Sequence, residues 1–134
     1  MGFKDISQIA GSAMAAQTVR LNTIASNLAN ADSVAGSEGE AYRARKPVFA
    51  TMLGGDAGGA VRVLDVVESA EPLRRAHEPD NPKADAAGMV YYTNVNEVAE
   101  MADMMSASRA FETNVEVIGR IKSMQASLLK LGES

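Results

Sequence analysis

The chain has 134 residues, of which 17 are acidic and 13 basic, and its formal net charge is −4. An acidic chain of this kind lacks the clustered basic surface that neutralises phosphates, so we do not expect it to bind nucleic acid. The absence of cysteine and the single histidine exclude a disulfide framework, a cysteine-based zinc site and a cluster of several histidine ligands. No apolar run reaches the roughly 18 residues of a bilayer-crossing helix, so we expect no membrane-spanning segment.

The first predicted element is a helix over residues 5–30. Asp5, followed three residues later by Gln8, indicates a capping box at its start. Ala13-Met14-Ala15 resembles a signal-peptidase site, but the segment is rich in alanine rather than leucine and cleavage would divide the helix, so we expect no cleaved signal peptide. The helix itself is indicated by apolar residues with a spacing close to the helical period, at Ile6, Ala10, Leu21, Ile24 and Leu28.

The middle of the chain, residues 32–93, differs in composition from both ends. It contains all four prolines and seven of the eleven glycines. Because few of its side chains are large, we expect this segment not to form a third layer along the helices. Its β-prone runs predict short strands at 47–53, 60–67 and 89–93, with a glycine-rich loop at 54–59 and a proline-bounded turn at 78–82.

A longer helix is predicted over residues 95–131, with an apolar stripe from Val98 to Leu131. Asn94, three residues before Glu97, indicates a capping box at its start. At about 1.5 Å per residue, the first helix is roughly 37–40 Å long and this one roughly 55 Å. Two antiparallel helices of unequal length leave apolar surface over, and another subunit would cover it. On pattern alone, the alternative of two stripes that cover each other in a small α+β domain stays open.

No catalytic constellation stands out. His77, Glu78 and Asp80 lie in one proline-bounded turn, but no second histidine or spaced carboxylate pair supports a metal site or a small hydrolase. We therefore expect no enzyme, no cofactor and no small-molecule substrate. Met101, Met104 and Met105 are typical of adaptable binding grooves. A soluble helical adaptor or chaperone that binds one partner helix is the alternative to a self-associating protein.

Residues 24–33 (IASNLANADS) resemble the signature segment of bacterial flagellar axial proteins. Residues 78–85, 88–90, 94–96 and 100–115 are similar to the proximal-rod members of that family, and the resemblance covers essentially the whole chain. It implies a mainly α fold with a small β-rich middle, in which two long terminal helices pack antiparallel into a coiled-coil-like layer. The parts are an N-terminal helix (1–31), a central β/loop segment (32–93) and a C-terminal helix (94–134) within one structural unit.

The resemblance also implies a structural subunit of the flagellar basal-body rod. Such subunits polymerise with copies of themselves and with other rod proteins into the tube that crosses the periplasm, transmits torque and conducts exported subunits. They pass through the flagellar type III export apparatus without a cleaved signal peptide. Residues of both helices are expected to pack between subunits, with the asparagines capping helices or bonding backbones: Leu21, Ile24, Asn27, Leu28, Asn30, Met101, Met105, Phe111, Asn114, Val115, Ile118, Met124 and Leu128.

Overall fold

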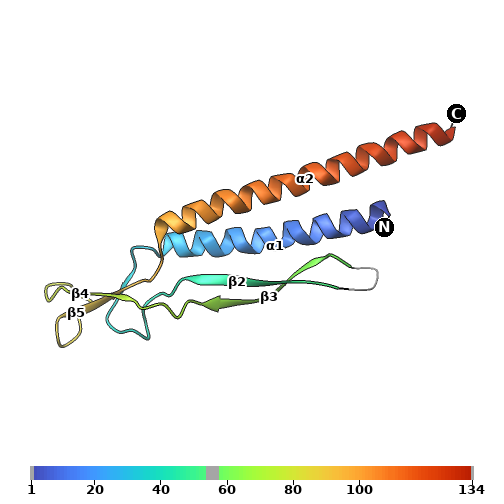
Figure 1. Cartoon of the computed structure of the whole chain (residues 1–134). Coiled ribbons are helices and arrows are strands. Elements are labelled where there is room, and N and C mark those ends of the chain that lie inside the picture. The colour runs from blue at the N-terminus through green and yellow to red at the C-terminus, as the bar shows by residue number, and fades with distance from the viewer. Residues whose placement is uncertain (1, 54–57, 134) are drawn as a thin grey trace.

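The computed structural model describes residues 2–53 and 58–133. Helix α1 (Phe3–Ala29) and helix α2 (Glu97–Glu133) lie side by side and antiparallel, and short strands form the segment between them (Figure 1). This arrangement confirms the predicted fold of two long packed helices with a small β-rich middle. Residues 54–57 of the predicted glycine-rich loop lie outside the described residues.

Both helices begin at residues other than those the predicted capping boxes require. The Gly2 N–H donates to the Asp5 carboxylate at 2.8 Å, so Asp5 lies within the first turn of α1 rather than before it. A carboxylate there is stabilised by the unpaired N–H groups and the helix dipole. At the start of α2 the side chain of Asn96 accepts from the Ala99 N–H at 3.1 Å. Asn96, and not Asn94, is therefore the cap of α2.

Asn94 instead joins the middle segment to the start of α2. Its side-chain oxygen accepts from the Ala44 N–H at 2.7 Å, and its side-chain nitrogen donates to the Glu71 carbonyl at 2.9 Å. These bonds reach 50 and 23 residues along the chain, whereas a cap bonds within one turn. The capping-box prediction for Asn94 was wrong because these two distant backbone groups occupy its amide.

Strands β2 (Arg45–Thr51) and β3 (Val61–Glu68) form an antiparallel hairpin that runs along α1, and α1 lies between the hairpin and α2 (Figure 1). The expectation that the middle segment forms no third layer was therefore wrong. Short side chains on α1 make the close approach possible: Ala16 is buried, and the Ser12 hydroxyl accepts from the Val61 N–H at 2.9 Å. Small residues on the helix let a strand pack without large side chains of its own.

The second sheet lies at the end of the molecule where α1 ends and α2 begins (Figure 1). Its antiparallel order is β1 (Val34–Ala35), β5 (Met89–Tyr92), β4 (Arg74–His77), with β5 in the centre. Only β5 was predicted, because β1 has two residues and β4 (RRAH) contains no run of β-prone apolar residues. Val90 of β5 is fully buried and anchors this sheet.

The buried apolar core of the described residues consists mostly of alanine. Burial of a valine, leucine or isoleucine side chain contributes roughly 1.5–3 kcal/mol. A buried alanine removes far less apolar area from water and contributes correspondingly less. The core therefore holds the layers close together but contributes little free energy for its length. Its members are Ala10, Ala16, Ile24, Ala44, Val90, Ala107 and Ile121.

Candidate assembly surface

Helix α2 carries a row of residues that faces α1, which we call the α2 seam. Among the described helices and strands, only α1 packs against α2, and the first turns of α2 also lie beside Ala44, Ser69 and Glu71. The covered positions alternate in steps of three and four, the repeat of a coiled coil. They are buried or half-buried: Glu100, Met104, Ala107, Phe111, Asn114, Ile118 and Ile121.

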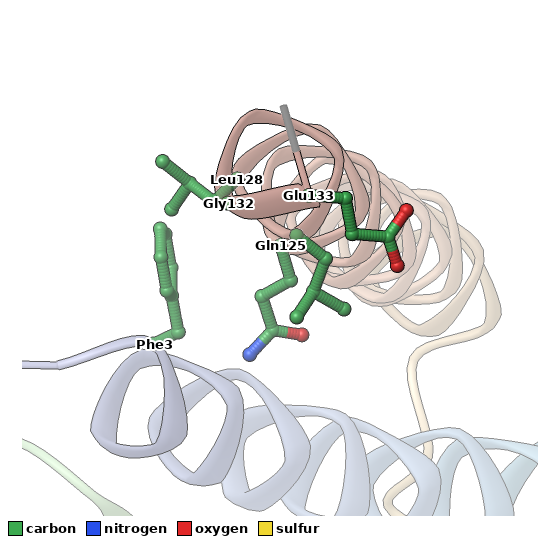
Figure 2. A pocket seen from close by; sticks show the side chains of 6 residues that line it. Phe3, Gln125, Leu128, Gly132 and Glu133 are labelled. Carbon is green, nitrogen blue, oxygen red and sulfur yellow. The ribbon is translucent and has the colours of Figure 1, made fainter.

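The α2 seam continues beyond the region that α1 covers. The next positions in the same repeat are Gln125, Leu128 and Gly132, and all three are exposed. An open cleft lies here between the two helices, and Phe3 of α1 lies across it from Leu128 (Figure 2). Leu128 is 54% exposed and the neighbouring Leu129 71%. The helices separate toward this end, so a stretch of α2 with coiled-coil spacing has no helix against it within the described chain (Figure 1).

A second apolar surface lies on the outer side of α2 near its start. Val98, Met101 and Met105 are 79%, 54% and 69% exposed, although the α2 seam residues of the same turns are covered. The predicted single stripe from Val98 to Leu131 is therefore two surfaces, because steps of three and four taken from Val98 and from Glu100 follow different faces of the helix. Only one of these faces meets α1.

The hairpin adds apolar surface that the predicted packing residues did not include. Val61 and Val63 are half-buried, whereas Leu64 and Val66 are exposed. Strand residues alternate between faces, so a run with valine or leucine at nearly every position must expose one set when only one face is packed. That run, apolar at all positions from 60 to 67 except Arg62 and Asp65, was the signal in the sequence that could have identified this surface.

The thirteen residues expected to pack between subunits fall into three groups. Ile24 and Asn27 are buried inside this chain, which leaves them no surface for a neighbour. The exposed group is Met101, Met105, Val115, Met124 and Leu128. The remaining six are half-buried: Leu21, Leu28, Asn30, Phe111, Asn114 and Ile118.

The three asparagines bond backbone groups of their own chain. Asn27, which is 1% exposed, donates to the Arg45 carbonyl at 2.9 Å and accepts from the Arg45 N–H at 2.9 Å and the Tyr42 hydroxyl at 2.8 Å. Its amide fastens β2 to α1. Asn30 and Asn114 each donate to the carbonyl four residues earlier, at 2.8 Å and 2.9 Å.

The polar turn around His77 is organised by structural contacts. Glu78 accepts from the Tyr92 hydroxyl at 2.8 Å and from the side chain of Asn81 at 3.1 Å. The hydrogen bond to Glu78 raises the pKa of Tyr92 above its usual 10.0, helped by partial desolvation and by the negative charge of Glu78. Among the described residues, no three His, Cys, Asp or Glu side chains are placed to hold a metal ion. Nor does any described helix have the length and hydropathy to cross a bilayer.

Two family models match the two helical ends of the chain. Residues 8–36 match the flagella basal body rod protein family, and residues 86–131 match the C-terminal part of the flagellar basal body rod FlgEFG proteins. The antiparallel terminal helices, with the uncovered continuation of the α2 seam, thus belong to a rod protein of the bacterial flagellum. Both matches include parts of the segments whose sequence resembled axial proteins.

Curated relatives show to which family of flagellar rod proteins the chain belongs. The chain is 51% identical to flagellar basal-body rod protein FlgC of Escherichia coli O6:H1 and 50% identical to that of Salmonella typhimurium, in each case over 99% of this chain and 100% of the relative. FlgC of Agrobacterium fabrum is 35% identical over 93% of this chain and 91% of its own length. The chain belongs to the flagellar basal-body rod protein FlgC family. It is a structural protein of the rod, and this membership favours the rod subunit over the helical adaptor that the sequence left open.

Proposed function

We propose that the chain is a proximal-rod subunit that polymerises with copies of itself and with other rod proteins into the tube that crosses the periplasm. In this role it transmits torque and encloses a channel for exported subunits, and it catalyses no reaction. Its partners are rod subunits and, during delivery, the flagellar type III export apparatus. The coaxial packing of α1 and α2 with helices of neighbouring subunits supplies the cohesion of the tube.

The observation that carries this proposal is the uncovered continuation of the α2 seam. Gln125, Leu128 and Gly132 keep the coiled-coil spacing after α1 has separated from α2. A coiled-coil contact buries apolar side chains at such positions, and Leu128 is the apolar one of the three, so a helix of a neighbouring subunit packed over Leu128 fits this face. A lone molecule has no further long helix in its described residues, so the partner comes from another subunit.

The free energy of association requires more than the contact at the end of α2. Full burial of a leucine contributes roughly 1.5–3 kcal/mol, so the exposed leucines near the end of α2 supply only a few kcal/mol together. Association costs about 4–15 kcal/mol in lost translational and rotational freedom. Several surfaces must therefore close at once, and the outer side of α2 near Met101 and the outer face of the hairpin near Leu64 are available for this.

The structure of α1 supports export without a cleaved signal peptide. Cleavage after Ala15 would remove the first half of α1, including the buried Ala10 and the Phe3 that borders the open cleft. The α2 seam would then lose part of its covered length. A subunit that packs through α1 needs this segment intact.

The test is complementation of a strain that lacks this chain, with the full-length Leu128→Gln variant. Glutamine is a good helix former, so the change removes apolar surface and spares the helix. We expect loss of motility and loss of the chain from purified basal bodies, with export of the variant unchanged. The matched control is Ala126→Gln, on an exposed position of the same turn, which should keep both. Normal rod incorporation of Leu128→Gln would refute packing through this end of α2.

A further inference from the structure

Helix α2 carries an exposed apolar patch between two opposite charges near its start. Val98, Met101 and Met105 are 79%, 54% and 69% exposed, and their spacing of three and four residues makes them neighbours on the helix surface. Glu97 lies beside Val98 at one end of this patch, and Arg109 lies one turn after Met105 at the other. We call this surface, from Glu97 to Arg109, the proximal patch. It begins with an acid and ends with a base.

The last turns of α2 carry a second exposed row, which we call the distal patch. Its members are again three or four residues apart: Lys122, Gln125, Leu129 and Glu133. Gln125, Leu129 and Glu133 also line the open cleft (Figure 2). The distal patch therefore borders the cleft, and it begins with a base and ends with an acid, the reverse of the proximal patch.

The two patches have matching spacing. From Val98 and from Lys122 the rows advance by three, four and four residues, so a displacement of 24 residues (98 to 122) aligns one row with the other. This displacement corresponds to about 36 Å along the helix. It places Val98 beside Lys122, Met101 beside Gln125, Met105 beside Leu129 and Arg109 beside Glu133. The two methionines then lie at the open cleft, where flexible thioether side chains adapt to an apolar lining.

The charges select the direction of the contact. Parallel alignment brings Glu97 within one residue of Lys122 and Arg109 beside Glu133, so both ends of the patches pair opposite charges. Antiparallel alignment would bring Glu97 to Glu133 and Arg109 to Lys122, and like charges across an interface are unfavourable. Within the described residues, none of these four side chains makes an ion pair in its own chain. The four charges therefore remain available to a neighbouring subunit.

We propose that the proximal patch of one copy of this chain packs, in parallel, against the distal patch of a second copy. The proposal rests on the polymerisation proposed above and identifies the helix that lies beside the end of α2 as the start of α2 of the next copy. The two patches are different surfaces, so a copy that uses one still offers the other. Such a head-to-tail contact repeats in one direction and propagates into a filament.

The absence of cysteine from the chain allows a clean crosslinking test. The full-length variant with both Met105→Cys and Leu129→Cys replaces the chain in the strain that lacks it, and its purified basal bodies are oxidised. The two cysteines are about 36 Å apart on one helix, so they form no disulfide within a copy. We expect disulfide-linked dimers and higher multiples on a non-reducing gel. Variants with only one of the two cysteines should give none.

A register control shifts one cysteine along the helix. Glu112→Cys with Leu129→Cys moves the first cysteine by seven residues, or about 10 Å, and should give at least about tenfold less linked product. A second matched pair, Met101→Cys with Gln125→Cys, keeps the displacement of 24 residues and should again give multiples. The absence of linked products from both matched pairs, or an equal yield from the control, would overturn the proposal.

A charge exchange tests the pairing of Arg109 with Glu133. Arg109→Glu sets two acids against each other, and we expect the amount of the chain in purified basal bodies to fall about fivefold, the most that one exposed ion pair typically gives. Adding Glu133→Arg to the same chain should restore the amount, which it would not do if Arg109→Glu had only damaged the helix. The control Arg120→Glu changes an exposed cation outside both patches and should have no effect. Failure of Glu133→Arg to restore incorporation would refute the pairing.

The crosslinks also separate this contact from polymerisation itself. If both matched pairs give no linked product while Leu128→Gln is lost from basal bodies, a different helix lies beside the end of α2, and the proposed function stands without this contact. If Leu128→Gln is incorporated normally but the matched pairs still link, the contact stands, and packing over Leu128 is not what holds the subunits together.

Discussion

The amide of Asn27 offers the sharpest test of how the hairpin is held. In Asn27→Ala the Arg45 N–H and carbonyl and the Tyr42 hydroxyl each lose a bond of 2.8–2.9 Å to an amide that is 1% exposed. A net hydrogen bond contributes about 0.5–1.5 kcal/mol, so three of them give a loss of about 3 kcal/mol in the free energy of unfolding. That loss is a large share of the roughly 5–15 kcal/mol typical of a folded chain.

Urea unfolding followed by far-UV circular dichroism measures the loss. A lower midpoint with an unchanged slope means that stability has fallen without a change in the surface exposed on unfolding. The matched control is Asn30→Ala, whose side chain makes one bond, to the Ser26 carbonyl at 2.8 Å, and which should cost less than about 1 kcal/mol. If Asn27→Ala costs no more than Asn30→Ala, the amide does not fasten the hairpin and the reasoning is refuted.

Three further outcomes follow from the geometry. Gly88 has φ +76°, and an added Cβ would lie 2.9 Å from the His77 ring, so Gly88→Ala should lower the free energy of unfolding in urea by about 2 kcal/mol. The control Gly119→Ala, with no atom within 4 Å of its Cβ, should raise it by up to about 1 kcal/mol. Equal effects of the two substitutions would contradict the assigned backbone strain. The hydrogen bond to Glu78 raises the pKa of Tyr92, so the folded state keeps a phenol proton that the unfolded state loses near pH 10.0. The stability that this bond contributes is present below that pH and is lost as the pH rises through the pKa of the folded state. The stability of Tyr92→Phe should fall less steeply with pH, and identical slopes would exclude a contribution of the Tyr92–Glu78 bond. In the dilute monomer, amide hydrogen exchange should be fast in the last turns of α2 and slow in the middle of α1, because α2 and the hairpin both cover α1. Uniform protection of both helices would show that no partner is missing.

The sequence by itself determined the two helices, because apolar residues every three or four positions can be buried only on a helix. It also placed three of the strands within a few residues: the apolar runs around Val48, Val63 and Val90 match β2, β3 and β5. The signature around residues 24–33 and the motifs near α2 were enough to place the chain among flagellar rod proteins, which the relatives confirmed. These features are local, since each depends on residues within a few turns of one another.

Only the tertiary structure decided which surfaces stay free. Asn27 and Asn94 look like helix-end residues, but their partners lie 18 and 50 residues away, and no local pattern reports bonds of that range. The hairpin packs along α1 because α1 has short side chains, such as Ser12 and Ala16, where a distant segment of the chain meets it. The stripe on α2 divides into two faces because α1 covers only one side of a helix and only part of its length. Periodicity predicts that a face will be buried, but the path of the whole chain decides what buries it and where another subunit is needed.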